Sequence, residues 1–213
     1  MARSFTTDSR DGDARAPGAL TRLLRFRGLP SHAARAEQIH DRRVVIVPKL
    51  RKSVTVAQAD GLLTDASGQP LAIFTADCVP IFLTAGQERV VGLLHAGWRG
   101  VQRNILQAAI RRIRKTWGIR ASEVEIWAGP SIGPCCFKVR WDVARFFPQA
   151  RRRAGGQWTV DLVAAIKAQA GRLGAHWGSQ KPANGCTMHN KRYFSYRRDQ
   201  TTKRQVSIIM KRD

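Results

Sequence analysis

Two apolar runs of this sequence each lead directly to a side chain that can do chemistry. Cys78 follows the run 71–75, and His95 follows the run 90–94, with Asp77 next to the cysteine. Apolar runs of this length are typical of buried strands, whose ends bring polar side chains to the edge of a sheet. We therefore expect the thiol and the imidazole to lie close together on neighbouring strands.

A cysteine and a histidine placed in this way support two chemistries. In the first, His95 accepts the proton of Cys78, and the thiolate attacks an acyl or amide carbon. In the second, both side chains bind Zn²⁺, and a third ligand completes a site that keeps one coordination position open. His40, just before the run 44–47, is the best available third ligand, because the other histidines lie in the N-terminal segment or in predicted loops. Each residue alone has a plainer explanation, as a packed thiol or a surface imidazole, and only the combination favours a site.

Two further segments contain side chains suited to substrate binding. Residues 129–136 hold two glycines, two prolines and two adjacent cysteines. Such a backbone predicts either a loop whose amides bind a ligand oxygen or a structural turn. In residues 194–199, an arginine beside aromatic side chains can grip a phosphate or carboxylate, or form a structural corner with Asp199. The candidate substrate contacts in these segments are Ser131, Cys135 and Arg197.

Short apolar runs and two amphipathic patterns define the elements that must position these side chains. The runs predicted as strands are 44–47, 71–75, 79–83, 89–94, 124–128 and 206–210. One helix is predicted from Val101 to Gly118 by apolar residues at helical spacing, and a second from an Asp161 N-cap to a Gly174 stop. This order predicts one mixed α and β domain over residues 36–213, preceded by a poorly defined segment, loose or weakly helical, over residues 1–35.

The charge of the chain is strongly positive. Its 213 residues carry 37 Lys and Arg against 15 Asp and Glu, a formal net charge of +22 that attracts polyanions nonspecifically. The basic residues are spread along the chain, with short clusters at 111–115 and 151–153, and no aromatic-interleaved RNA motif accompanies them. An arginine-rich solvated surface is therefore preferred, and a basic nucleic-acid-binding protein with an inactive site is kept as a rival.

The apolar runs are also shorter than the roughly 18 residues that a membrane span needs, and residues 1–35 contain no stretch resembling a signal peptide. These features predict a cytoplasmic protein with no membrane partner. Four cysteines, two of them adjacent, do not have the spacing of a disulfide framework, so reduced thiols are expected. The lack of a C-x-x-C pair argues against a zinc ribbon or finger, which needs paired close ligands from two loops.

Six ordered blocks of the sequence resemble one known family. They are QIH at 38–40, ADGLLTD at 59–65, TADCVP at 75–80, HAGWRG at 95–100, GPSIGPCC at 129–136 and FSYRRD at 194–199. The pattern resembles the laccase-domain or polyphenol oxidase family, which includes the bacterial peptidoglycan editing factor and purine nucleoside phosphorylases. The match extends over roughly residues 37–210.

The resemblance implies a fold, a metal and a set of reactions. The fold is α+β, a single domain with mixed sheets and outer helices in an α/β/β/α arrangement, similar to the catalytic domains of cytotoxic necrotizing factors. His40, Cys78 and His95 match the family's zinc ligands, which implies one zinc ion as the cofactor. The implied reactions are phosphorolysis of adenosine and inosine and deamination of adenosine, together with editing of cell-wall precursors. Copper-dependent phenol oxidation, the origin of the family name, agrees poorly with the chain, because its five histidines are too few for a multicopper site.

These reactions give roles to further residues. Deamination needs a proton shuttle, for which Asp77 is the candidate acid. Phosphorolysis needs phosphate held near the sugar carbon, for which Arg99 and the amides of 129–136 are the candidates. The chain departs from the family pattern at two points: Asp41 replaces the glycine that usually follows the first ligand, and the family's N-terminal Asn-Leu-Gly block is not found in residues 1–35.

Overall fold

A computed structural model describes residues 2–178 and 185–212, and its centre is a six-stranded mixed sheet. The strand order is β13-β9-β7-β8-β5-β3. The bounds are β3 Val44–Ile46, β5 Gly61–Thr64, β7 Val79–Ala85, β8 Val90–Ala96, β9 Val124–Ala128 and β13 His176–Trp177. Every residue of β7 and β8 is buried, as expected for strands covered on both faces of a sheet.

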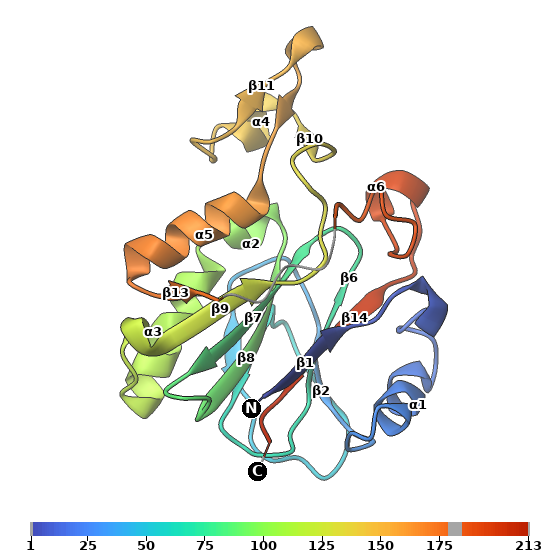
Figure 1. The fold of residues 1–213 in the computed structure, drawn as a ribbon, viewed down its shortest axis with the longest axis vertical. Helices are drawn as coiled ribbons and strands as arrows, with labels where there is room; N and C mark the ends of the chain where they lie inside the picture. Colours follow the sequence, from blue (N-terminus) through green and yellow to red (C-terminus); the bar gives the residue numbers. More distant parts are fainter. Residues whose placement is uncertain (1, 179–184, 213) are drawn as a thin grey trace.

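A five-stranded mixed sheet lies beside the first one. Its order is β1-β14-β6-β2-β4. The bounds are β1 Arg3–Thr6, β2 Ala34–Ala36, β4 Val54–Val56, β6 Leu71–Thr75 and β14 Gln205–Met210. Strand β14 pairs antiparallel with both β1 and β6, so the two ends of the chain share one sheet (Figure 1).

The two sheets pack face to face through apolar side chains. Phe82 and Trp127 of the six-stranded sheet stack with ring centroids 5.6 Å apart, and both belong to one buried cluster with Leu71, Ile73 and Ile209 of the five-stranded sheet. This cluster fills the space between the sheets and orients the strand ends that carry the polar side chains.

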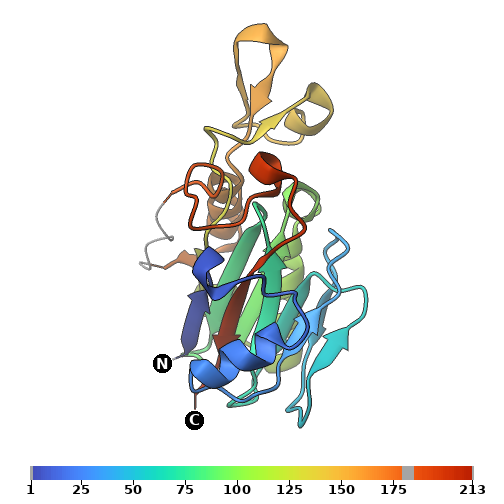
Figure 2. The same ribbon diagram turned by 90° about the vertical axis from the view of Figure 1, so that its right-hand side faces the viewer.

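Helices cover the two outer faces. Helices α2 Trp98–Gln102, α3 Ile105–Trp117 and α5 Leu162–Leu173 pack on the outer face of the six-stranded sheet, and α1 Ala19–Phe26 packs on the outer face of the other (Figures 1 and 2). The order of layers is therefore α/β/β/α, and the predicted α+β single-domain class is confirmed. The likeness to cytotoxic necrotizing factors stays a prediction.

A small three-stranded antiparallel sheet projects beyond the N-terminal end of α5 (Figure 1). It consists of β10 Lys138–Val139, β12 Trp158–Thr159 and β11 Arg151–Arg152, with α4 Trp141–Ala144 beside it. The remaining short elements are the 3-10 turns Ser9–Asp11, Ala121–Glu123 and Ala154–Gly156, and the short helix α6 Tyr196–Asp199.

The predicted strands are confirmed, and one predicted helix is divided. Residues 71–75 and 124–128 form β6 and β9 with the expected bounds. The helix predicted from Val101 to Gly118 is instead α2 and α3, because Asn104 between them adopts the left-handed conformation with φ 59°. The predicted caps of α5 are present, since the Asp161 carboxylate accepts the amide of Ala164 at 2.9 Å and Gly174 has φ 78°.

The structure corrects the expectation for residues 1–35, because they contain β1, α1 and part of β2. Leu20 and Leu24 of α1 are buried in a cluster with Phe74, Val206 and Ile208. A sequence pattern with few apolar residues did not reveal this segment, since its burial depends on the sheet against which it packs. None of the helices within the described residues has the length and apolar character that a bilayer crossing requires.

If α1 is an integral layer, truncating its buried face should destabilise the whole protein. We expect Leu24→Ala, at a fully buried position, to lower the free energy of unfolding by about 2–5 kcal/mol. Phe26→Ala on the same helix is the control, because Phe26 is 84% exposed and its truncation should change stability by less than about 0.5 kcal/mol. Urea unfolding of both variants measures the difference, and equal small effects would mean that the segment is only loosely attached.

Candidate metal centre

Three side chains distant in the sequence converge at one end of the central sheet. Cys78 lies in the turn between β6 and β7, His95 lies in β8 opposite Pro80, and His40 lies in the loop before β3. Their donor atoms all lie within 4.8 Å of one another. The two imidazole rings meet edge to face, with centroids 4.7 Å apart and planes at 79°. The structure therefore brings together the three residues predicted as a ligand set.

The backbone at this point adopts conformations that side chains usually avoid. His40 has φ 61° and Asp77 has φ 91°, both in the left-handed region. At Gly97, an added Cβ would lie 3.1 Å from Cys78 Sγ and 3.1 Å from His40 Cδ2. A side chain at Gly97 would therefore push apart two of the three ligands, which gives the glycine of the HAGWRG block a steric reason.

A buried carboxylate that sequence reasoning did not single out organises the ligands. The Asp60 side chain is fully buried, and its Oδ1 lies 2.7 Å from Nδ1 of His95. The same carboxylate accepts the backbone amides of Ile39, His40 and Asp41 at 3.1, 3.0 and 2.8 Å. Because Nδ1 of His95 faces the Asp60 carboxylate, Nε2 is the nitrogen of this ring that is available as a metal ligand. In the sequence this residue was marked only by its place directly before the apolar run of β5 and inside the ADGLLTD block.

The three groups form a charged network. Burial opposes ionisation of the Cys78 thiol, but the charge of His95 and hydrogen bonds with His40 and His95 lower its pKa to about 6. Burial likewise opposes protonation of His95, but the Cys78 thiolate and the Asp60 carboxylate raise its pKa to about 9. For Asp60, burial is outweighed by the hydrogen bond with His95 and by the loop amides, and its pKa is lowered. Without a metal, the site therefore favours a thiolate beside an imidazolium.

Asp77, predicted as a proton shuttle, has both carboxylate oxygens engaged within the protein. Its Oδ1 accepts the hydroxyl of Thr187 at 2.7 Å, and its Oδ2 accepts the backbone amide of Arg197 at 2.7 Å. Its backbone carbonyl accepts the amide of Ile132 at 2.9 Å. These contacts favour a positioning role for Asp77, which precedes Cys78 and holds the turn of that ligand in place.

The predicted substrate contacts differ in their exposure to solvent. Arg99 is exposed, with its guanidinium 4.4 Å from the centre of the Trp98 ring. Arg197 is also exposed, and it donates to the carbonyl of Lys138 at 2.7 Å. Ser131 is buried. The predicted structural corner is formed by the next arginine along the chain.

This corner is formed by Arg198 and Asp199, whose side chains approach to 2.7 Å. The same guanidinium donates to the carbonyls of Thr187, Met188 and Tyr193 at 2.9 to 3.1 Å. The arginine therefore ties the turn 187–193 to α6 and is used within the fold.

The amides of the loop 129–136 are largely used inside the protein. Gly129 donates to Pro80, Ile132 to Asp77, Gly133 to Cys186 Sγ and Cys136 to Gly133. These bonds favour the structural turn over the ligand-binding loop, two interpretations between which the composition did not decide. Phosphate binding by these four amides is not supported.

A second group of metal-binding side chains lies in the same part of the protein. The donor atoms of Cys135, Cys136, Cys186 and His189 all lie within 4.8 Å of one another. The chain has no C-x-x-C pair, but an adjacent cysteine pair from one loop meets a C-x-x-H pair from another here. Burial and the neighbouring sulfurs of Cys135 and Cys186 raise the pKa of Cys136 to about 12, whereas backbone amides of Gly133, Met188 and His189 outweigh burial and lower the pKa of Cys186.

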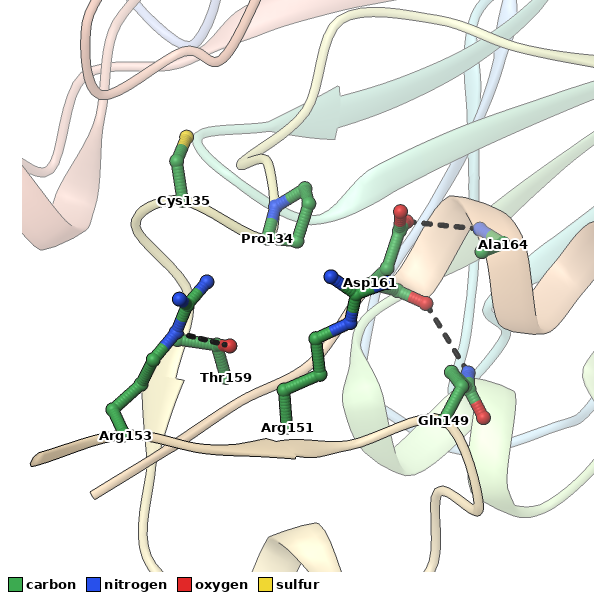
Figure 3. A pocket seen from close by; sticks show the side chains of 8 residues that line it. All are labelled: Pro134, Cys135, Gln149, Arg151, Arg153, Thr159, Asp161 and Ala164. Carbon is green, nitrogen blue, oxygen red and sulfur yellow. Dashed lines mark hydrogen bonds between the residues drawn. The ribbon is translucent and has the colours of Figure 1, made fainter. Parts of the chain in front are cut away.

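Cys135 also lines a cavity of about 380 Å³ between the small sheet and α5 (Figure 3). The lining residues are Pro134, Cys135, Gln149, Arg151, Arg153, Thr159, Asp161 and Ala164. Arg153 donates to Thr159 Oγ1 at 3.3 Å, and the carboxylate of Asp161 caps α5 (Figure 3). Two of the three arginines of the 151–153 cluster, Arg151 and Arg153, thus line this cavity.

One further arginine near the centre escaped sequence reasoning. Arg204 is partly buried and donates to the carbonyls of Thr201 and Lys203, each at 2.8 Å. Its pKa is lowered, first by burial and then by Arg15, against the opposing influence of Cys78 and two carboxylates. The guanidinium therefore stands within electrostatic reach of Cys78, although more than a hundred residues separate them in the sequence.

Comparisons with known proteins agree with this fold. A family model described as "Multi-copper polyphenol oxidoreductase laccase" matches residues 4–212. A purine nucleoside phosphorylase of Xylella fastidiosa is 32% identical over 200 residues, covering 88% of this chain and 75% of the relative. A purine nucleoside phosphorylase of Streptomyces coelicolor is 33% identical over 203 residues, covering 91% of this chain and 83% of the relative. The crystal structure of YlmD from Geobacillus stearothermophilus matches with a TM-score of 0.88 and 27% identity, over 100% of this chain and 92% of that one.

The fold and ligand group thus define a four-layered α+β protein with a candidate metal centre at the end of its central sheet. The chain belongs to the laccase-like polyphenol oxidoreductase family, as its sequence blocks predicted. The family match begins at residue 4 and so includes the N-terminal segment. Asp41, which departs from the expected family pattern, pairs with Arg103 at 2.9 Å, and His40 before it has φ 61°.

The role of Asp60 can be tested by an isosteric change. We expect Asp60→Asn to weaken metal binding at this centre about 10–100-fold, because an amide oriented by three backbone donors no longer holds His95 with the same charge. Asp41→Asn is the matched control, since its carboxylate faces Arg103 and only its backbone amide contacts Asp60. Competition with a chromophoric chelator measures both affinities; equal affinities in the two variants would exclude the orienting role.

Proposed function

We propose that this chain is a zinc-dependent purine nucleoside enzyme that phosphorolyses adenosine and inosine and deaminates adenosine. The observation that carries the proposal is the convergence of His40, Cys78 and His95 within one family whose relatives include proteins named purine nucleoside phosphorylase. The partners are then a purine nucleoside and phosphate. Phosphate must enter near the sugar, while deamination needs only water and the base.

Zinc is the metal that the donor set favours. One thiolate and two imidazoles are ligands that Zn²⁺ accepts in three-ligand sites, leaving a position for water or substrate. When bound, such an ion polarises a substrate oxygen and lowers the pKa of a water molecule toward neutrality. The multicopper alternative is disfavoured because, of the five histidines, only His40 and His95 belong to this ligand group.

Other residues of the protein position the ligands and supply charge for the phosphate. Asp60 holds the His95 ring and the His40 loop, so that the ligands are placed before the metal arrives. Asp77 positions Cys78 through its contacts with two other loops. Positive charge for the phosphate comes from Arg99, two residues after Gly97, and from the partly buried Arg204.

A second candidate function uses the same residues as a cysteine hydrolase. The Asp60 carboxylate, the His95 imidazole and the Cys78 thiol form an orienting group, a base and a nucleophile in that order, and the pKa of Cys78 is lowered to about 6. Its substrate would be an amide, including one in a cell-wall precursor. Editing of such precursors belongs to this second candidate as well as to the zinc enzyme.

Removing a ligand separates the two candidates. We expect Cys78→Ser and His40→Ala each to lose one equivalent of zinc and more than about 100-fold of activity, since even an outer-shell change costs 10–100-fold. The assay incubates protein with adenosine and phosphate and separates adenine, inosine and hypoxanthine. His176→Ala, at an exposed position in β13, is the control and should keep full zinc and activity.

Chelation of the wild-type protein gives the opposite outcomes for the two mechanisms. The zinc enzyme loses activity when metal is removed and regains it when zinc is returned. A cysteine hydrolase keeps its activity in chelator and loses it to a thiol reagent. Full zinc and full activity in Cys78→Ser would sink the zinc proposal.

The phosphate role of the arginines has a kinetic signature. We expect Arg204→Gln to raise KM for phosphate about 10-fold, the loss of roughly 1.4 kcal/mol of charge-assisted binding, with little change in KM for the nucleoside. Arg25→Gln, on the exposed side of α1, is the matched control. Equal phosphate KM values in the two variants would remove Arg204 from the site; the same measurement on Arg99→Gln tests the other arginine.

A further inference from the structure

The second ligand group is not used by the proposed reaction. It consists of Cys135, Cys136, Cys186 and His189. Cys135 and Cys136 lie in the loop after β9, and the other two ligands lie about 50 residues later, in the turn before α6. Three sulfurs and an imidazole from two loops thus meet at one point.

Backbone hydrogen bonds and one contact from an amide to the Cys186 sulfur hold the two loops together. The amide of Thr187 donates to the carbonyl of Ser131 at 3.0 Å, and Ser131 and Cys186 form an isolated parallel bridge. The amide of Gly133 donates to the sulfur of Cys186 at 3.1 Å. In the second loop, the amide of His189 donates to the carbonyl of Cys186 at 3.0 Å, which closes the C-x-x-H turn. The ligands are thus placed on a backbone that is already ordered.

The donor atoms of the group are close enough to surround one metal ion, since all of them lie within 4.8 Å of one another. Bonds of about 2.3 Å to sulfur and 2.0 Å to nitrogen separate neighbouring ligand atoms by roughly 3.5–3.8 Å. The sulfur of Cys136 lies 3.2 Å from Nε2 of His189, and the sulfur of Cys135 lies 3.8 Å from Nδ1 of the same ring. Small side-chain adjustments are enough to centre an ion, with one ring nitrogen as the ligand.

Simple packing or a disulfide explains the group less well. Cys135 and His189 are exposed, so their burial is not the reason for the convergence. A disulfide would use two of the three sulfurs and leave the third sulfur and the imidazole without a function, and all three cysteines are free thiols. The amide bonded to the Cys186 sulfur is the kind of outer contact that supports a ligating thiolate.

We propose that Cys135, Cys136, Cys186 and His189 bind a second zinc ion in a closed, structural site. Four protein ligands complete a tetrahedron and leave no position for substrate, which distinguishes this site from the three-ligand centre. The ion does not take part in the reaction, and the proposal stands whether or not the chain is a nucleoside enzyme. The zinc content of the fully loaded protein is then two per chain.

The second ion connects to the first centre through Asp77. Thr187, inside the C-x-x-H turn, donates its hydroxyl to Asp77 at 2.7 Å, and Ile132 in the first loop donates its amide to the same residue at 2.9 Å. Asp77 directly precedes Cys78 and has φ 91°. An ion that joins the two loops therefore stiffens the support of a ligand in the other centre.

Metal counting on four forms of the full chain tests the proposal. Wild type, Cys78→Ser, His189→Ala and the double variant are expressed with zinc and weighed by native mass spectrometry. The expected contents are two, one, one and none. His189→Ala changes an exposed ligand and so perturbs folding least, and His176→Ala is the matched control that keeps both ions. Cys136→Ser, at a buried ligand, provides an independent second variant.

Each pattern of metal loss assigns failure to one site. If Cys78→Ser keeps one zinc and the double variant keeps none, the second site stands, whatever the activity. If wild type holds one zinc, lost in Cys78→Ser and kept in both His189→Ala and Cys136→Ser, the second site is overturned while the proposed function survives. Fewer than four free thiols in the chelated, denatured and unreduced wild type would also overturn it, in favour of a disulfide.

Cobalt substitution identifies the ligands directly. With Co²⁺ in place of zinc, three thiolates at one ion give intense sulfur-to-metal charge-transfer absorption, which we expect to persist in Cys78→Ser and to fall by at least half in Cys136→Ser. A spectrum that is unchanged by Cys136→Ser would show that these sulfurs do not bind the metal.

Discussion

The buried carboxylate of Asp60 is the constraint on which the candidate centre depends. A charged group without solvent must be matched by donors, and here the donors are three consecutive amides and the imidazole of His95. Satisfying that one charge fixes the loop that carries His40 and the ring orientation of His95 together. The loop accepts φ 61° at His40 because these bonds over-determine it. The family's usual glycine after this histidine is therefore not required for the turn in this chain.

A second carboxylate, Asp77, extends the same logic to the third ligand. Its three hydrogen bonds join the turn of Cys78 to the loop after β9 and to the segment before β14. Those two segments also carry the second ligand group. Both aspartates near the centre thus position the candidate ligands. The contacts of Asp77 therefore connect the two ligand groups through the fold.

The layers explain why such strained turns can persist. Strands β7 and β8 are buried along their whole length, with apolar clusters on both faces, so their ends cannot shift without disturbing two cores. The N-terminal helix α1 covers the outer face of the five-stranded sheet. In that sheet, β6 ends just before Asp77, and β14 follows the segment that Asp77 contacts. The same packing that stabilises the domain therefore holds the ligands in place before any metal binds.

The sequence by itself predicted the strands at 44–47, 71–75, 79–83, 89–94, 124–128 and 206–210, the caps of α5 and the α+β class, and it singled out the three candidate ligands. These depend on local periodicity and on side-chain chemistry that a short motif displays. The sequence did not determine the break at Asn104, the burial of α1 or the choice between turn and anion loop at 129–136, since each depends on which neighbour takes the hydrogen bonds or the apolar face. Only the tertiary structure revealed Asp60 as the orienting carboxylate, Arg204 as a nearby charge and His189 as a partner of three cysteines. Their contacts join segments separated by 35 or more residues, and no local pattern encodes which of many acids, arginines and histidines will meet.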